Sequence, residues 1–370
     1  MELSPEDGLR LQVLLQNELK AVRLDEHAMI LYALTAAGEA NIPLSPNRAN
    51  DEYLKVLRST LSEHILGSAG GYPVYLKRWT RMQQTSHSSL KDLLKLGENE
   101  AVMAVTNAEQ LDLDVAKLSW WCTQNLDIQP EAAYHLLQHK IILQDDLGKE
   151  IASYLYEYLP FMQDTEKTLN TLVSILQPGL LDHEQIAALA NRAKNKSVYQ
   201  VGFLVARMES FLAEHAENPV RKKVKFIDGS PISNVLKKSL STKGQTFINS
   251  AKTALNKISS EEVTYPLINT IGEWFAEALF VKRQRVYEQY TKQVELMMAE
   301  PERCHVLYVF LEKNPDSENL VRAVLLLAGV YEAIVFKDIL HTGAVGSQLR
   351  RKIKDTLKPM LQALNVLSDL

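Results

Sequence analysis

Regularly spaced helix-start signals are the feature that most constrains how this chain can fold. Four aspartates precede amphipathic runs at intervals of 18, 19 and 18 residues: Asp127, Asp145, Asp164 and Asp182. Aspartate favours the position before a helix because its carboxylate accepts hydrogen bonds from unpaired amides of the first turn. Gln185 follows Asp182 at the spacing of a capping box. The spacing predicts helix pairs of roughly 37 residues, as in a helical-repeat array, although an irregular bundle with short loops would show it too.

The composition agrees with a mainly α protein. The 370 residues include only 15 Gly and 13 Pro, and 46% of them are hydrophobic and 23% charged. These values are ordinary for a globular protein with a real core, and the length suits two or three domains. We therefore expect a helical bundle or an irregular helical-repeat array with a small N-terminal antiparallel β-meander.

The N-terminal region carries the β signals. Ser4 and Pro5 predict the cap and first residue of a helix. Three short segments follow, with alternating hydrophobicity and turn residues between them, and predict the meander: 20–25, 28–34 and 39–44. Asn50 is expected to cap a helix that stops at Gly67, and Ser88 to start a short helix that Gly97 ends.

The rest of the chain reads as helix. A single helix is predicted from Ser197 to Glu217, and long helices are predicted at about 263–299, 301–313, 316–339 and 347–367. The apolar run Val321–Phe336 contains Arg322 and Glu332, which favours a buried core helix over a membrane span. Changes in composition suggest three parts: an α+β part at 1–97, a helical array at 98–218, and a basic linker with long helices at 219–370.

Residues 66–82 combine glycines, aromatic rings and cations more densely than any other segment. Such a stretch can turn sharply and present flat, hydrogen-bonding groups. The candidate binding residues are Gly70, Gly71, Tyr72, Tyr75, Arg78, Trp79 and Arg81. The spacing matches no phosphate-binding glycine motif. Packing of the aromatic rings inside the fold is the favoured interpretation, and a ligand pocket is the alternative.

A basic run lies at 221–258, where nine Lys/Arg and one Asp give a local charge of +8 in a chain of net charge −4. Such a patch attracts a polyanion or an acidic protein, although lysine-rich surfaces are often only solvated. The candidate residues are Arg221, Lys222, Lys223, Lys225, Lys237 and Lys238.

The sequence presents no catalytic or metal-binding motif. His135 and His139 stand one helical turn apart, but no third ligand has matching spacing, so a solvated helix face is expected. Cys122 and Cys304 are far apart and outside any C-x-x-C pair, which suits a reduced cytoplasm. No signal-peptide pattern is present at the N-terminus. We expect no metal and no cofactor.

Several segments resemble one bacterial family. They are Gly67-Ser68, Gly70-Gly71-Tyr72-Pro73-Val74-Tyr75-Leu76, Arg78-Trp79-Thr80-Arg81-Met82, Trp120-Trp121, Leu176-Gln177-Pro178-Gly179-Leu180, Tyr199-Gln200-Val201-Gly202-Phe203-Leu204, Ala344-Val345-Gly346 and Arg350-Arg351-Lys352. Together they make the chain similar to the DsrS proteins, which are encoded with the dissimilatory sulfite reductase genes of sulfur-oxidising bacteria. The resemblance implies a cytoplasmic accessory protein of sulfur oxidation with a regulatory role, and it brings no assigned catalytic residue.

The sequence and this resemblance lead to three functional hypotheses. The first is a non-catalytic accessory protein that binds a protein partner of the sulfur-oxidation system. The second is an RNA- or DNA-binding regulator that uses 221–258. The third is an enzyme with a pocket built on 66–82.

Overall fold

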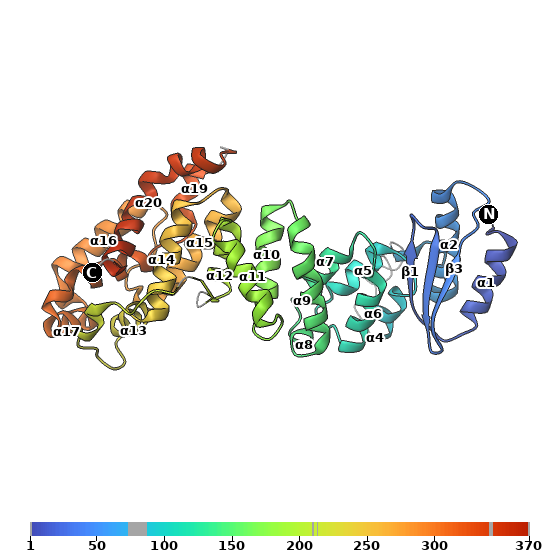
Figure 1. Ribbon diagram of the computed structural model, residues 1–370, viewed down its shortest axis with the longest axis horizontal. Coiled ribbons are helices and arrows are strands. Elements are labelled where there is room, and N and C mark those ends of the chain that lie inside the picture. Colours follow the sequence, from blue (N-terminus) through green and yellow to red (C-terminus); the bar gives the residue numbers. More distant parts are fainter. Residues whose placement is uncertain (1, 73–86, 209–210, 213, 340–342, 369–370) are drawn as a thin grey trace. The chain divides into compact units, whose positions relative to one another are not determined.

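The structure is a computed structural model that describes residues 2–72, 87–208, 211–212, 214–339 and 343–368. It confirms a mainly α protein with one small antiparallel sheet near the N-terminus (Figure 1). The chain divides into two compact units, Met1–Tyr158 and Leu159–Leu370. The three-part division expected from composition stays a prediction.

The first unit begins with the predicted helix and meander. Helix α1 spans Pro5–Leu15, and Ser4 caps it by accepting a hydrogen bond from the Asp7 amide. Three strands then pair antiparallel in the order β1-β2-β3 (Figure 1), with the bounds Leu19–Asp25, Ile30–Thr35 and Gly38–Pro43. In the register, Leu24 lies opposite Leu31, which in turn pairs with Ile42. The sequence therefore predicted these strands to within two residues.

Strand β1 is buried on both of its faces. Val22 and Leu24 join a core cluster with α1 and with α2, which spans Asn50–Leu66. Arg23 points the other way, because successive side chains of a strand alternate. Its guanidinium lies 4.8 Å from the ring of Trp121, donates to the Trp121 carbonyl at 3.3 Å and pairs with Glu39 at 3.1 Å. A buried arginine thus fixes the sheet to the helical part of the unit.

The remaining helices of the first unit are α4 His87–Leu93, α5 Asn99–Thr106, α6 Leu113–Thr123, α7 Gln129–Leu136, α8 Lys140–Leu143 and α9 Asp146–Tyr158. Two predicted caps are wrong. Ala49, not Asn50, precedes α2, and Ile128, not Asp127, precedes α7. Pro130 in the first turn of α7 already lacks an amide hydrogen, so that helix depends less on a side-chain cap.

The second unit is built from helices joined by short 3₁₀ turns. The helices are α10 Thr165–Ile175, α11 His183–Ala193, α12 Ser197–Val205, α13 Pro231–Ser239, α14 Thr242–Asn256, α15 Glu261–Trp274, α16 Tyr287–Ala299, α17 His305–Lys313, α18 Glu318–Ala328, α19 Ala333–Ile339 and α20 Gly346–Ser368. Asp164 caps α10, and Asp182 with Gln185 forms the predicted capping box of α11.

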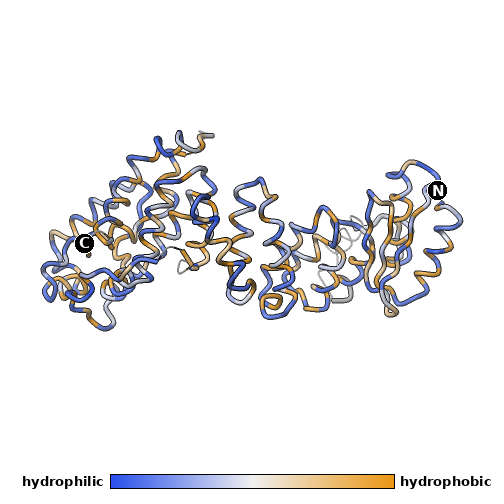
Figure 2. The backbone as a smooth tube through the Cα atoms, in the orientation of Figure 1, coloured by the Kyte–Doolittle hydropathy of each residue, from blue (hydrophilic) through white to orange (hydrophobic). Residues whose placement is uncertain are grey.

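One large core cluster joins α10 and the helices from α12 to α20. Most helices alternate between hydrophobic and polar residues, visible as orange and blue segments in Figure 2, and their apolar faces converge. Phe247 of α14 and Trp274 of α15 stack with ring centroids 3.9 Å apart. Helices far apart in the sequence pack together, such as α14 with α20 and α18 with α20. Such long-range pairs are the mark of a bundle rather than of a simple array.

The predicted helix Ser197–Glu217 is wrong beyond Val205. Arg207 has φ +60°, a left-handed conformation that ends a helix, and the Met208 amide donates to the Phe203 carbonyl. The Arg207 guanidinium lies 5.5 Å from the ring of Trp274. This tertiary contact favours a turn where the local sequence favours a helix.

Two of the predicted long helices are also interrupted. The segment 263–299 is split into α15 and α16, and between them Arg283 donates to the carbonyls of Gly272 and Ala328. The segment 316–339 is split at Gly329, where an added Cβ would lie 2.1 Å from the Tyr290 ring. Close packing accompanies both breaks, and at the second one the glycine itself also weakens the helix.

Among the described helices, no single one is long and apolar enough to cross a membrane, and one bent pair meets the length and composition criteria together. That pair is Pro315–Ala328 with Ala333–Ile339, bent by 63°.

Candidate functional site

The glycine turn after α2 is held by side chains of the first unit. Gly71 has φ +64°, and its amide donates to Ser62 Oγ at 2.9 Å. The next amide, of Tyr72, donates to Glu98 Oε2 at 3.0 Å. A Cβ at Gly71 would lie 1.9 Å from Glu98 Oε1, so any other residue there would displace that carboxylate as well as strain the backbone. Both amides therefore already donate to side chains of the protein. The Glu98 carboxylate also lies where a bound phosphate would need positive charge.

An open cavity of about 540 Å³ lies against this turn and is lined by Lys55, Arg58, Glu98 and Glu100 as well as the glycines. Burial raises the pKa of Glu98, and the amide of Tyr72 and the charge of Arg58 oppose that shift. Tyr75, Arg78, Trp79 and Arg81 lie outside the described residues. The packing interpretation and the binding interpretation of 66–82 therefore both stay predictions.

His135 of α7 and His139, which follows that helix, have separate partners. His135 Nε2 lies 3.9 Å from Glu131 Oε1, and burial lowers the pKa of His135. His139 Nε2 lies 2.8 Å from the carbonyl oxygen of Thr106. Within the described ranges, no three His, Cys, Asp or Glu side chains are grouped to hold a metal ion.

The cations of the basic run are distributed over different parts of the second unit. Arg221 pairs with Glu217, four residues earlier in the chain. Lys237 and Lys238 lie at the end of α13, where the Lys238 ammonium is 3.8 Å from the Trp274 ring centroid. Lys222 is exposed in the short turn Pro219–Lys222. Of the six candidates, Lys223 and Lys225 line a cavity of the second unit.

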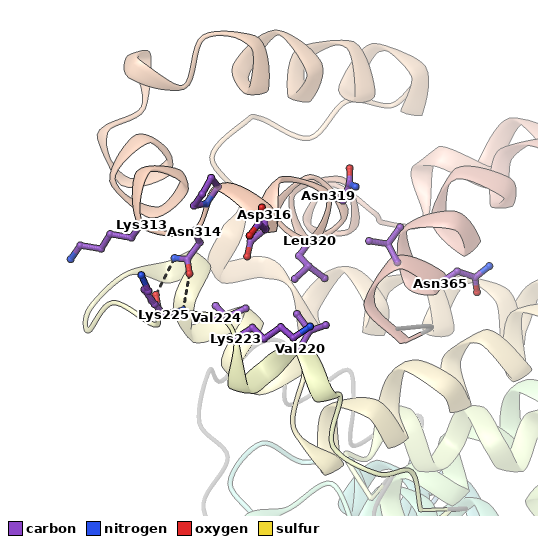
Figure 3. Close-up of a pocket in the computed structure, with 13 residues that line it drawn as sticks. Val220, Lys223, Val224, Lys225, Lys313, Asn314, Asp316, Asn319, Leu320 and Asn365 are labelled. Carbon is purple, nitrogen blue, oxygen red and sulfur yellow. Dashed lines mark hydrogen bonds between the residues drawn. The ribbon is translucent and has the colours of Figure 1, made fainter.

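That cavity, which we call the lysine cavity, has a volume of about 760 Å³ (Figure 3). Three segments of the second unit form its wall: the turn 220–225, the segment 313–320 at the start of α18, and the end of α20 around Asn365. Val220, Val224 and Leu320 form its apolar side, and Val224 and Leu320 are 7% and 4% exposed. The site is therefore open and polar at its rim and apolar below.

Asn314 fixes the rim of the lysine cavity. Its side chain is 5% exposed. Its Oδ1 accepts from the Lys225 amide at 2.7 Å, and its Nδ2 donates to the Lys225 carbonyl at 3.0 Å (Figure 3). The Nδ2 also donates to the Phe310 carbonyl at 3.1 Å. One buried amide thus pairs with both backbone groups of Lys225, as a neighbouring strand would. The backbone of Lys225 is therefore held in place, while its side chain extends into solvent.

The rim carries three lysines and one carboxylate. Lys223, Lys225 and Lys313 are all exposed, and Asp316 is the acidic residue among the described lining residues. In Figure 3, Lys313 extends outward at the edge while Lys223 lies along the wall near Val220. Within the part of the chain that the structure describes, none of the three ammonium groups is ion-paired. Their positive charge is available to a ligand.

The sequence predicted only half of this site. Lys223 and Lys225 belong to the basic run, but Lys313, Asn314 and Asp316 come from about 90 residues further along. In the sequence, Asn314 and Pro315 lie between the two predicted helices 301–313 and 316–339. No local pattern could show that its amide pairs with the backbone of Lys225, because that contact depends on tertiary packing.

Comparisons with protein-family models, with curated proteins and with solved structures gave no match to this chain. The resemblance to the DsrS family accordingly stays a prediction.

Proposed function

We propose that this protein is a non-catalytic, cytoplasmic accessory protein that binds an acidic segment of a partner protein in the lysine cavity. The observation that carries the proposal is the anchoring of Lys225 by Asn314 beside two further lysines without ion-pair partners among the described residues. Because the backbone of Lys225 is already held by Asn314, less backbone freedom is lost when its side chain binds a carboxylate, and the entropic cost of binding is smaller.

The form of the cavity favours a peptide over a nucleic acid. Its wall offers apolar side chains from Val220, Val224 and Leu320 but no aromatic ring among the described lining residues. Single-stranded nucleic acids bind largely by stacking on aromatic rings. An apolar side chain flanked by Glu or Asp matches both the apolar wall and the cationic rim. Charge complementarity at such a rim gives specificity and a fast association rate.

The partner is proposed to belong to the dissimilatory sulfur-oxidation system. This part of the proposal rests on the resemblance to the DsrS proteins at the residues given above. The cavity contributes the chemistry of recognition but does not identify the partner.

A first experiment uses the purified full-length protein and defined probes. Fluorescent peptides that carry a central Leu between Glu residues, and a single-stranded RNA of equal charge, are titrated at several salt concentrations. We expect the acidic peptide to bind and its affinity to fall with salt. Tighter binding of the RNA, with a steep salt dependence, would replace the proposal with the nucleic-acid hypothesis.

The matched variants assign the binding to the cavity. Changing Lys223, Lys225 and Lys313 together to Ser should abolish peptide binding. A control triple with the same change of charge replaces Lys167, Lys354 and Lys358, which are exposed and outside the cavity. The control should bind as the wild type does. Equal loss in both triples would show a non-specific charge effect and refute the site.

A second experiment tests the biological context. The wild-type protein and the cavity triple are cross-linked to their partners in cells growing on reduced sulfur, and the captured complexes are treated with nuclease. We expect a nuclease-resistant partner from the sulfite reductase system that the cavity triple fails to capture. Capture of the same proteins by both forms, or nuclease-sensitive capture, would contradict this function.

A further inference from the structure

Strand β3 presents an open backbone edge. It has a neighbour on one side only, because the sheet order is β1-β2-β3, and all its residues except the half-buried Ile42 are exposed (Figure 1). The Leu44 amide donates to the Met29 carbonyl, so every second residue counted back from Leu44 bonds to β2. The backbone groups of Glu39 and Asn41 therefore point away from β2. The described residues offer these groups no hydrogen-bond partner.

This edge lacks most of the features that keep an exposed strand from pairing. Natural edge strands are blocked by lysines, by bulges or by a covering segment. Strand β3 contains no lysine, it pairs with β2 without a shift in register, and no described strand covers it. The charge of Glu39 is paired with Arg23 at 3.1 Å. Pro43, which has no amide hydrogen, blocks only the end of the strand, so residues 38–42 stay open to another strand.

The edge is complementary to itself in one antiparallel register. When Ala40 of one copy lies opposite Ala40 of another, Glu39 of each copy faces Asn41 of the other. These two pairs exchange four backbone hydrogen bonds, because all their outward groups are open. The Asn41 side chain can also donate to the Glu39 carboxylate across each pair. Gly38 lies opposite Ile42 and leaves room for its larger side chain.

The neighbouring registers make fewer hydrogen bonds. With the two-fold axis at Glu39, Asn41 faces Ala37, whose amide already donates to the Thr35 hydroxyl at 3.2 Å. With the axis at Asn41, Glu39 faces Pro43, which cannot donate and whose carbonyl already accepts from α1. The outward-facing groups of β3 therefore favour the register described above.

Helix α1 places two exposed apolar side chains beside this edge. Leu9 and Val13 are 64% and 56% exposed, and they stand one helical turn apart on one face. Around the helix, Arg10 lies between that face and the buried Leu14. Arg10 Nη1 donates to the Pro43 carbonyl at 3.3 Å, so this side of α1 is turned toward the open edge of β3. A strand added to β3 therefore brings further surface toward Leu9 and Val13.

We propose that two copies of this chain associate through β3, about a two-fold axis at Ala40. The two sheets join into one sheet of six strands, and both α1 helices lie on the same side of it. Leu9 and Val13 then lose exposed apolar area, which adds a hydrophobic contribution to the hydrogen bonds. Such a contact uses the same surface of both copies and closes as a dimer. It belongs to the first unit and does not depend on the lysine cavity or on the function proposed for it.

Cysteine trapping tests the register. In Ala40→Cys, the two introduced thiols lie opposite each other at a non-hydrogen-bonded pair, where side chains are closest. Oxidation of the full-length variant with copper phenanthroline should link most of it into covalent dimers. The controls are the wild type, which keeps Cys122 and Cys304, and Ala37→Cys, whose exposed position faces Pro43 of the other copy. Linkage no greater in Ala40→Cys than in these controls would overturn the proposal.

Sedimentation velocity tests the association itself. We expect the wild type to form a dimer whose dissociation constant rises about tenfold or more in Ala40→Lys, because like charges then face each other across the axis. The control Ala28→Lys adds the same charge at the exposed β1–β2 turn and should leave the dimer unchanged. Leu9→Ser with Val13→Ser should also weaken it, whereas Leu296→Ser, at an exposed apolar residue of the second unit, should not. A wild type that stays monomeric even at millimolar concentration, or a dimer unaffected by Ala40→Lys, would refute the proposal.

Discussion

Asn314 connects the stability of the second unit with its lysine cavity, and replacing it by Ala tests both. The substitution removes three side-chain hydrogen bonds, to the Lys225 amide, the Lys225 carbonyl and the Phe310 carbonyl. The Phe310 carbonyl keeps a partner because it also accepts from the Asn314 backbone amide at 3.0 Å. The loss therefore falls on the two bonds to Lys225.

The magnitude follows from those two bonds. A typical intramolecular hydrogen bond contributes about 1 kcal/mol, and water can reach the exposed Lys225 after the change. We expect Asn314→Ala to lower the free energy of unfolding by about 2 kcal/mol. For a unit of this size, that corresponds to a fall in Tm of roughly 4–8 °C. The variant should also bind the acidic peptide more weakly, since Lys225 is no longer held.

Urea unfolding followed by circular dichroism measures the change, with the transition of each unit fitted separately if they do not coincide. The control is Asn319→Ala, which replaces an exposed residue of the same type on the same cavity. We expect that control to change stability by less than about 0.5 kcal/mol. A loss below about 0.5 kcal/mol in Asn314→Ala, or equal losses in both variants, would refute the anchoring role of Asn314.

Three further predictions concern the first unit, each measured by urea unfolding. Gly71→Ala should lose at least about 1 kcal/mol more than Gly67→Ala, because both positions have positive φ but only Gly71 meets Glu98; equal losses would contradict the contact. Arg23→Met should destabilise the unit by about 2 kcal/mol through loss of the hydrogen bonds and ring contact of the buried guanidinium, and a neutral result would contradict their importance. Burial raises the pKa of the Cys122 thiol to about 12, so only the unfolded state ionises as the pH rises above about 9. The unfolded state then binds fewer protons, so stability falls with rising pH. The wild type should lose about 1 kcal/mol more than Cys122→Ala between pH 8 and 10, and parallel pH profiles would refute this.

The sequence alone determined the elements whose signals are local. The meander was predicted because alternation of side chains along a strand is a two-residue pattern that any sheet face imposes. Asp164, Asp182 and Gln185 were predicted as caps because a capping bond joins residues only three positions apart. The mainly α class follows from the same local preferences summed along the chain.

Tertiary structure decided where the long helices break. Local periodicity favours helix through Arg207, but the Trp274 ring packs at that position. At position 329 the glycine itself weakens the helix, and the Tyr290 ring leaves no room for a larger residue. A helix ends there because the packed core gains more than the lost hydrogen bonds of the continuing turn. Such contacts join residues tens of positions apart. The local hydrophobic periodicity of the sequence therefore cannot predict them.

The sequence also predicted one part of the candidate site, and the tertiary structure determined the rest. Lysine density identified Lys223 and Lys225, because composition alone shows a basic run. Only the folded chain brings Asn314 to the backbone of Lys225. Hydrogen bonds between distant segments form only when whole helices are placed to within about an ångström. The packing of the core determines that placement, and no local sequence pattern predicts it.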